Sequence, residues 1–323
     1  MQIKANAPTR IDLAGGTIDI WPIWAILGEA TTINVAIDLP SEVIVSIPSK
    51  RFKNTPNNTK NALINGVLEY YNSNCNLTQQ IDIKIKSYYP KRAGLAGSSS
   101  VLLSLISCLD AYLEIKRSYA ETINLASNLE AKILRGPTGT QDYYPILWGG
   151  INVMHYCLNQ VKHELIPLEG EIYESFKDSI LLVKPKGFHE SGNLNWILIR
   201  EFIEGKENTI FQINRIMEAA NLVYDSLQDG NVTEFYKGIN IDMSARKSFG
   251  KDFVPEALCR LEEELGKRNL NGAKICGAGG DACLALFCRP RKRETVAQFI
   301  EEKGFHVIMP TLRMKGMEIS QLH

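Results

Sequence analysis

Hydrophobic and polar residues alternate along much of the chain, and this alternation is the pattern of half-buried β-strands. In the first such stretch, Arg10 and Asp12 alternate with the apolar Ile11 and Leu13, so both charged side chains are expected on one face of a strand. The pattern predicts strands at 2–15 (two short strands divided by a turn at 6–8), 30–47 (a hairpin across 38–41), 81–85, 151–156, 162–166, 179–184, 273–276, 283–288 and 304–309.

A helical period replaces the alternation elsewhere. It predicts helices at 62–71, after 98–100, at 120–134, over most of 194–247, at 255–265 and at 291–303. The order strand–helix–strand occurs in both halves with a helical bridge between them, which predicts a two-layer α+β protein of two lobes. Because the pattern changes near residue 190, we expect an N-terminal domain at 1–185 and a C-terminal domain at 186–323.

The stretch Pro90–Leu103, which reads PKRAGLAGSSSVLL, combines a glycine loop with the start of an apolar helix. Gly94 and Gly97 allow a sharp turn or a close approach to another molecule, and Ser98–Ser100 can cap the helix. The free N–H groups and positive dipole end of such a helix bind anions, of which phosphate is the commonest. A capped turn before a core helix explains the same residues equally well. No Gly-Lys-Ser/Thr follows, so this is not a Walker loop.

Two acidic residues further along the chain are candidates for chemistry. Asp142 follows a Gly-Pro-Thr-Gly turn and could accept a proton from a substrate hydroxyl, although Asp is also common as a turn residue. Glu130 lies late in a predicted helix and could reach a metal near the glycine loop, because Mg²⁺ takes one or two carboxylates together with substrate phosphates. Alternatively, it pairs with Lys132 or Arg135 on a solvated helix face.

Three further features could belong to the same site. Arg10 could stabilise a phosphoryl group, since a guanidinium matches that geometry, or it could form a structural ion pair with Asp12 or Asp19. Asp19 lies in a loop with two glycines, where it could bind sugar hydroxyls or form an Asx-turn. The loop Gly277–Gly280 could pack against phosphates or simply connect two strands.

The bulk composition narrows the class of protein. The 323 residues are 45% hydrophobic and 22% charged with a formal net charge of zero, which is typical of a globular protein and argues against nucleic acid as the main partner. The seven cysteines include no Cys-x-x-Cys pair and the five histidines show no metal-ligand spacing. Because no signal-peptide pattern and no long apolar run occur, we expect a soluble cytoplasmic protein that does not contact a membrane.

Three separated motifs, taken in order, resemble the signature motifs of the GHMP kinases, the superfamily of galactokinase, homoserine kinase, mevalonate kinase and phosphomevalonate kinase. The motifs are Pro8-x-Arg10-x-x-Leu13-x-Gly15 with Asp19, Pro90-x-x-x-Gly94-Leu95-x-Gly97-Ser98-Ser99, and Lys274-x-x-Gly277-Ala278-Gly279-Gly280. Within this superfamily, Ala14–Asp19, Gly136–Tyr143 and Gly149–Asn152 are similar to the D-glycero-D-manno-heptose 7-phosphate 1-kinases and related sugar 1-kinases, and Ser244–Ser248 weakly resembles a Trp-x-x-Lys-Lys stretch of that group.

The resemblance implies the GHMP kinase fold, in which two lobes of mixed or antiparallel sheet are covered by helices and the active site lies between them. It also implies Mg²⁺-dependent transfer of the γ-phosphoryl group of ATP to a sugar or sugar phosphate, at the anomeric hydroxyl, by a monomer or a homodimer. By position, Asp142 matches the catalytic base, Arg10 the residue near the transferred phosphate, and Ser98 (or Ser99) and Glu130 the Mg²⁺ ligands. The implied nucleotide contacts are Gly94, Leu95, Ala96, Gly97, Ser98, Ser99, Ser100, Gly277 and Gly279, and the implied substrate contacts are Asp19, Gly15, Gly16, Thr17 and Gln141.

The sequence departs from the family pattern in three places. Ala96 interrupts the usual Gly-Leu-Gly, Asp281 replaces the fourth glycine of the third motif, and residues 186–193 lack the Thr-Gly-x-x-Arg stretch of the heptose kinases. A non-catalytic sugar- or nucleotide-binding regulator on the same fold, and a mevalonate-type isoprenoid kinase, therefore stay open beside the sugar kinase. The Gly-Gly-Thr-x-Asp loop favours a sugar over an isoprenoid precursor, because Asp suits the recognition of hydroxyl groups.

Overall fold

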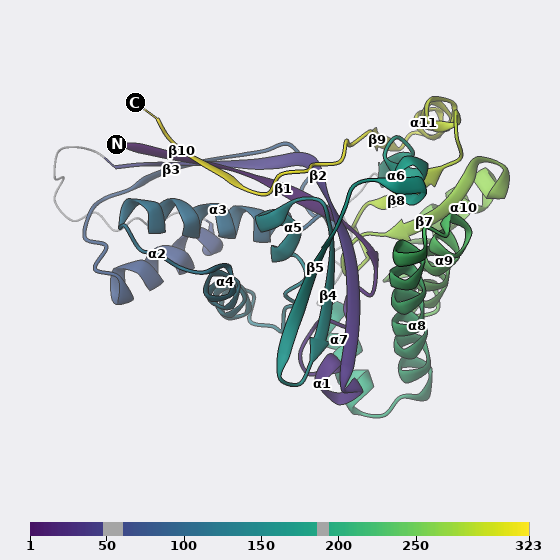
Figure 1. Cartoon of the computed structure of the whole chain (residues 1–323), viewed down its shortest axis with the longest axis horizontal. Helices are drawn as coiled ribbons and strands as arrows, with labels where there is room; N and C mark the ends of the chain where they lie inside the picture. The colour runs from purple at the N-terminus through teal and green to yellow at the C-terminus, as the bar shows by residue number, and fades with distance from the viewer. Residues whose placement is uncertain (48–60, 186–193, 323) are drawn as a thin grey trace.

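A computed structural model of the protein describes residues 1–47, 61–185 and 194–322 (Figure 1). These residues form two antiparallel sheets, one of order β10-β1-β2-β4-β5 with β3 paired to β2, and one of order β7-β8-β6-β9. The strands are β1 (Gln2–Ala14), β2 (Glu29–Ser46), β3 (Asp82–Ser87), β4 (Ile151–Cys157), β5 (Gln160–Ile166), β6 (Ile180–Lys184), β7 (Leu270–Ile275), β8 (Leu284–Cys288), β9 (His306–Ile308) and β10 (Glu318–Leu322).

Helices cover the faces of both sheets. In Figure 1, α2, α3 and α4 lie along one half of the first sheet, and α8, α9 and α10 lie on the side of the second sheet. The helices are α1 (Ile23–Leu27), α2 (Ala62–Asn74), α3 (Gly97–Tyr112), α4 (Tyr119–Leu134), α5 (Tyr143–Trp148), α6 (Gly170–Phe176), α7 (Leu194–Ile203), α8 (Glu207–Asp229), α9 (Val232–Lys247), α10 (Glu256–Asn269) and α11 (Arg293–Glu302). Within the described residues, no helix has the length and apolar character that crossing a membrane requires.

The long ribbon of β1 and β2 corrects two sequence predictions. The expected turn at 6–8 is a register shift inside one continuous strand, and the expected hairpin across 38–41 does not form, because β2 continues unbroken to Ser46. Ala7 pairs with Ser41 and Thr9 pairs with Ile37, so Pro8 lies opposite a stretch that contains Pro40. Neither proline can donate a ladder hydrogen bond, which makes this the place where a bulge costs least.

The chain passes from one sheet to the other at points that differ from the predicted domain boundary at residues 185 and 186. Strand β6, which precedes residue 186, pairs with β8 and β9 in the second sheet. Strand β10, at the C-terminal end, returns to the first sheet and pairs with β1, so the two ends of the chain lie side by side (Figure 1). The sequence pattern did not predict β10, α1, α5 or α6, all of which are short.

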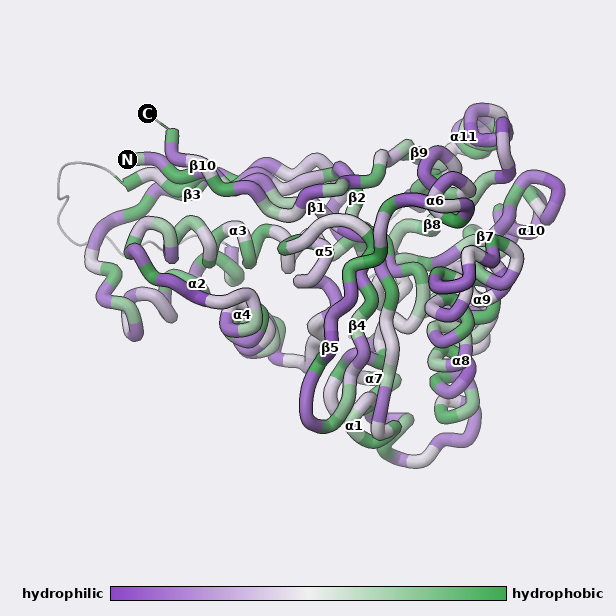
Figure 2. The backbone as a smooth tube through the Cα atoms, viewed as in Figure 1, coloured by the Kyte–Doolittle hydropathy of each residue, from purple (hydrophilic) through white to green (hydrophobic). Residues whose placement is uncertain are grey.

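Buried apolar residues form two cores, and the charged end of β1 lies where they meet. Ile3, Ala5 and other residues before the register shift belong to the core under α2–α4, whereas Ile11 and Leu13 after it belong to the core between the two sheets. Figure 2 shows the hydrophobic character of α3, which is enclosed, and the mostly hydrophilic character of α10, which is exposed on one side. Arg10 and Asp12 are therefore buried between two apolar regions.

Candidate active site

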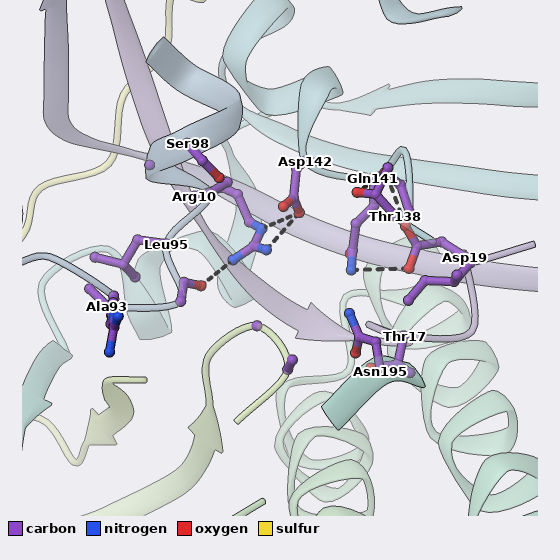
Figure 3. Close-up of a pocket in the computed structure, with 18 of the residues that line it drawn as sticks. Arg10, Thr17, Asp19, Ala93, Leu95, Ser98, Thr138, Gln141, Asp142 and Asn195 are labelled. Atoms are coloured by element: carbon purple, nitrogen blue, oxygen red, sulfur yellow. Dashed lines mark hydrogen bonds and ion pairs between the residues drawn. The ribbon is translucent and has the colours of Figure 1, made fainter. Parts of the chain in front are cut away.

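A cavity of about 370 Å³ lies at the junction of the two halves of the molecule (Figure 3). Its walls come from β1, the loops at 17–20 and 138–142, the glycine loop at 92–98 and the turn at 277–278. Asn195 of α7 also lines the cavity. Segments far apart in the sequence thus converge on one cavity, and they include parts of all three motifs.

The glycine loop places the start of α3 at the cavity. Gly94 has φ +70°, and a Cβ there would lie 2.6 Å from the Cys276 carbonyl oxygen, so no larger residue fits. Ala96 is the residue that caps α3, in the left-handed region at φ 59°, and no side-chain hydrogen bond caps the helix. The expectation that Ser98–Ser100 would cap the helix is wrong, because these serines lie inside its first turn. The first amides of α3 are left free of a side-chain partner, next to the cavity that Gly97 and Ser98 line.

Two of the three serines point toward Glu130 and the third points away from it. The Ser98 hydroxyl is exposed at the cavity and donates to Glu130 Oε1 at 3.0 Å, and the Ser99 hydroxyl donates to the same carboxylate at 3.1 and 3.2 Å. Ser100 faces the first sheet instead, where its hydroxyl lies 2.6 Å from that of Ser41, and it does not line the cavity. Successive helical residues are about 100° apart, which explains why one serine of three reaches the cavity.

Glu130 is buried rather than solvated. Besides the serines, the Tyr143 hydroxyl donates to its Oε2 at 2.6 Å, and burial raises the pKa of the carboxyl above its usual range. The alternative of a pair with Lys132 does not form, since Lys132 lies 3.5 Å from Glu69.

The oxygens around Ser98 fit a hard cation. A hydroxyl and a carboxylate converge there, and both are oxygen ligands that Mg²⁺ accepts. Among the described residues there is no group of three or more His, Cys, Asp or Glu side chains that could hold a metal. A cation at Ser98 and Glu130 would therefore take its remaining ligands from water and from a bound phosphate, which is how Mg²⁺ is commonly held.

Arg10 connects the glycine loop with Asp142. Its Nε and Nη2 donate to Asp142 Oδ1 at 2.8 and 2.6 Å, and its Nη1 donates to the Gly94 carbonyl at 2.6 Å (Figure 3). The guanidinium also lies 3.8 Å from Asp12. Burial acts to lower the pKa of Arg10, but the carboxylates of Asp142 and Asp12 outweigh burial and raise it, so the group stays charged. Both the expected functional role and the expected ion pair with Asp12 are compatible with these contacts.

The other end of the cavity is lined by a carboxyl group, a hydroxyl group and two side-chain amides, those of Asp19, Thr17, Gln141 and Asn195. Asp19 accepts the Gln141 backbone N–H at 3.1 Å and its side-chain Nε2 at 3.4 Å, as Figure 3 shows beside Thr17 and Asn195. Burial first, and the charge of Asp142 second, raise the pKa of Asp19 to about 7. The buried Gln141 Oε1 has no hydrogen-bond partner within the described residues. This end of the cavity therefore offers hydroxyl-binding groups without a fixed negative charge.

The remaining predicted residues lie in the walls or behind them. Gly277 and Thr17 line the cavity, whereas Gly15, Gly16 and Gly279 do not. Asp281, which replaces a motif glycine, is buried outside the cavity lining, and its carbonyl accepts a hydrogen bond from Lys184. The departure from the heptose-kinase pattern at 186–193 lies outside the described residues.

Sequence reasoning missed some cavity residues and all of the charged residues beneath the cavity. Asn195 and Thr138 line the cavity, and nothing in their local sequence distinguishes them. Asp12 was considered only as an ion-pair partner of Arg10 and Lys274 only as a motif residue, and the two form an ion pair of 2.8 Å. The sequence did offer one indication of these charged residues, because the alternation of β1 places Arg10 and Asp12 on the same face of the strand.

Comparisons with known proteins agree with this geometry. A family profile described as the GHMP kinases N terminal domain matches residues 62–150. The Arabidopsis thaliana protein named "Probable glucuronokinase 2" is 24% identical over 259 residues, which are 76% of this chain and 68% of that protein. A crystal structure of a D-glycero-D-manno-heptose 1-phosphate kinase from Bacteriodes thetaiotaomicron superposes with a TM-score of 0.78 at 19% identity and 99% coverage of both chains.

A second solved structure, the Lactococcus lactis galactokinase complexed with galactose, superposes with a TM-score of 0.79 at 15% identity, covering 98% of this chain and 95% of that one. At these identities the superpositions establish the fold. The chain therefore has the GHMP kinase fold, and its residues 62–150, which include the glycine loop, α3, α4 and the loop that carries Asp142, match the GHMP kinases N terminal domain.

Proposed function

We propose that this protein transfers the γ-phosphoryl group of ATP to a hydroxyl of a sugar or sugar derivative, at the anomeric position. The observation that carries the proposal is the guanidinium of Arg10, which joins the Asp142 carboxylate to the glycine loop at the floor of one cavity. One side chain, Arg10, thereby connects the proposed base, Asp142, with the loop that precedes the phosphate-binding start of α3.

Phosphoryl transfer depends on positioning and charge neutralisation more than on covalent chemistry. In the proposed mechanism, the backbone amides of Gly97 and Ser98 bind the phosphates and Arg10 stabilises the charge that develops on the transferred group. Asp142 accepts the proton of the attacking hydroxyl. Ser98 and Glu130 would hold Mg²⁺, which would supply neutralisation of the phosphate charge.

The acceptor is proposed to lie at the end of the cavity formed by Asp19, Gln141, Thr17 and Asn195. An unpartnered amide oxygen and a carboxyl group with a pKa of about 7 can accept from and donate to neighbouring hydroxyls. The names of the similar proteins, a glucuronokinase, a heptose phosphate kinase and a galactokinase, suggest a sugar, a sugar acid or a sugar phosphate.

Coupled detection of ADP release with a panel of acceptors tests the proposal. The panel contains glucuronate, galactose, heptose 7-phosphate, mevalonate and homoserine, and we expect Mg²⁺-dependent turnover with a member of the sugar group. NMR of the product then locates the phosphate at the anomeric carbon. Ligand binding without turnover on any acceptor would favour the regulator, and turnover of mevalonate would favour the isoprenoid kinase.

The variant Asp142→Asn tests the proposed base. Loss of general-base catalysis costs about 10²- to 10⁴-fold in kcat, so we expect a loss in this range with the same fold by circular dichroism. Asp178→Asn, at an exposed position outside the cavity, is the matched control and should leave kcat unchanged. Full turnover by a correctly folded Asp142→Asn protein would exclude the role of base.

A further inference from the structure

Four ionisable side chains form a buried cluster behind the cavity. They are Asp12 of β1, Asp242 and Arg246 of α9, and Lys274 of β7, with exposed fractions of 0%, 0%, 2% and 0%. Two carboxylates and two cations balance each other, which buried charges require. None of the four lines the cavity, so none can act by touching a ligand there.

Asp242 connects the cluster to the loop of the first motif. Its Oδ1 lies 2.6 Å from Arg246 Nε and 3.1 Å from Lys274 Nζ, and its Oδ2 accepts the backbone N–H of Gly15 at 2.9 Å. On the other side of the cluster, Asp12 accepts the backbone N–H of Gly277 at 3.0 Å. The cluster thus holds the backbone of the first and the third motif at the same time.

Arg246 bridges these two loops directly. Its Nη2 donates to the Gly16 carbonyl at 2.5 Å, and its Nη1 donates to the Gly277 carbonyl at 3.3 Å and to the Thr17 hydroxyl at 3.5 Å. A Cβ on Gly16 would lie 3.0 Å from Arg246 Nη2 and 2.6 Å from Asp12 Oδ2, so the loop fits closely over the cluster. One loop follows β1 of the first sheet and the other follows β7 of the second. Thr17 and Gly277, one from each loop, both line the cavity.

We propose that Asp242 and Arg246 are positioning residues for phosphoryl transfer. They fix the loop of Gly15–Thr17, on the acceptor side of the cavity, relative to the turn at Gly277, which faces the glycine loop on the phosphate side. This inference rests on the proposed function. The planar guanidinium is needed because it donates in two directions at once, whereas a lysine ammonium at the end of a flexible chain cannot hold both carbonyls.

The catalytic consequence follows from geometry. Transfer requires the acceptor oxygen and the phosphorus in near-attack alignment, and a misplacement of about 1 Å can cost about 10²-fold in rate. Because Arg246 touches neither substrate, its loss should leave ground-state binding nearly intact and act on kcat.

The pair of variants Arg246→Lys and Lys247→Met tests this. Arg246→Lys keeps the charge beside Asp242, and we expect kcat to fall about 10- to 100-fold while KM for ATP and for the acceptor each change less than about threefold. Lys247 is the next cation on α9, but it pairs with Glu262 at 2.9 Å away from the cavity, so Lys247→Met should leave kcat and both KM values unchanged. An Arg246→Lys protein with the kcat of the wild type would overturn the proposal, and so would an equal loss in Lys247→Met.

Hydrogen exchange provides a readout that does not require turnover. In the wild-type protein we expect slow exchange of the Gly15 and Gly277 amides, and in Arg246→Lys faster exchange confined to residues 15–17 and 277–279. If both amides of the wild-type protein exchange at the rate of exposed loop amides, Asp242 and Arg246 do not fix the two loops. This outcome would refute the positioning role even if the variant does not fold. If the wild-type protein turns over no acceptor but its Gly15 and Gly277 amides are protected, the proposed function fails, whereas the fixing of the two loops by Asp242 and Arg246 is supported.

Discussion

Asp19 is a buried carboxyl group that the fold leaves without a direct cationic partner among the described residues. Its carboxylate accepts hydrogen bonds from the backbone and side-chain nitrogens of Gln141, and its side chain is 3% exposed. Burial and the charge of Asp142 outweigh those hydrogen bonds and the more distant Arg10, and they raise the pKa to about 7. Near neutral pH the group is therefore partly protonated and can donate as well as accept a hydrogen bond.

This shift predicts a pH-dependent stability that Asp19→Asn should abolish. An unfolded Asp has a pKa of about 3.9, so the folded state binds the extra proton between about pH 4 and 7, and wild-type stability falls as pH rises through that window. Asn cannot ionise, and its amide can still accept the Gln141 N–H. We expect the free energy of unfolding of the variant, relative to the wild type, to be about 2–4 kcal/mol higher at pH 8 than at pH 4.5.

Urea denaturation at the two pH values measures this difference, and Asp178→Asn, at an exposed site, is the control that should show none. Parallel pH profiles for the wild type and Asp19→Asn would show that the carboxyl titrates normally.

Gly139 makes the position of Asp19 possible. A Cβ on Gly139 would lie 1.8 Å from Asp19 Oδ2, so Gly139→Ala must displace the carboxyl group. We expect KM for the acceptor to rise at least about tenfold, the effect of losing one or two good hydrogen bonds, while KM for ATP changes less than twofold. Initial-rate kinetics with each substrate varied in turn separate the two constants, and an equal rise in both would place Asp19 outside the acceptor site.

At the residue scale the motif residues could be predicted from the sequence, but of their partners only Asp12, beside Arg10, was among those named. The positions of Arg10, Asp19, Glu130 and Asp142 followed from motif spacing, and all four meet the cavity or its immediate neighbourhood in the structure. The direction of Ser100 could not be predicted, because the helix starts at Gly97 and a shift of one residue rotates every side chain by about 100°.

The residue that caps the start of helix α3 is an alanine, Ala96, in a conformation that favours glycine. Ala96 stands where the family motif has glycine, and its φ of 59° lies in the left-handed region, which glycine adopts without a Cβ penalty. For an L-residue this conformation costs roughly 1–2 kcal/mol, and a β-branched side chain is strained further. The departure noted in the sequence therefore places an L-residue at a left-handed backbone position.

We predict that Ala96→Val destabilises the protein by at least about 2 kcal/mol, because of this strain. The matched control is Ala111→Val, at an exposed position of the same helix, where only helix propensity changes and the expected loss is about 0.5 kcal/mol. Thermal denaturation of the two variants compares them directly, and equal losses would argue against a left-handed Ala96.

Errors at the scale of elements had two physical sources. Local alternation does not distinguish a hairpin from a long bulged strand, because Pro8 and Pro40 suit either. Strand β10 escaped prediction because all five of its residues are exposed, so no buried face patterns its sequence, and backbone pairing with β1 alone defines it. Longer elements with an apolar face, such as α3, α4 and α8, were predicted because burial imposes their period.

At the scale of the whole molecule, the two sheets are joined by buried charge as well as by apolar packing. Asp12 on β1 of the first sheet pairs with Lys274 on β7 of the second, and α9 contributes Asp242 and Arg246. Burial acts to raise the pKa of Asp12, but Lys274, Arg10 and Arg246 outweigh it and lower the pKa. Residues 262 positions apart thus depend on each other, a relation that no local pattern in the sequence expresses.

This dependence predicts strong coupling in a double-mutant cycle of Asp12→Asn and Lys274→Met. Each single variant leaves an uncompensated buried charge, which costs about 3–5 kcal/mol. The double variant removes both charges, so its loss should be smaller than the sum of the single losses by at least about 2 kcal/mol. Urea denaturation gives the three values, and the exposed pair Lys237 and Glu234, 2.8 Å apart, serves as a control cycle with coupling below about 1 kcal/mol.

The Asp12–Lys274 pair also predicts how stability changes with pH in the acid range. A lowered Asp12 pKa contributes stability above the unfolded value of about 3.9 that is lost as pH falls through the folded value. Asp12→Asn should therefore lose less stability between pH 5 and pH 3 than the wild type. Additive single losses together with parallel acid profiles would mean that the two sheets are held by apolar packing alone, and that Asp12 and Lys274 contribute to neither the stability nor the alignment of the halves.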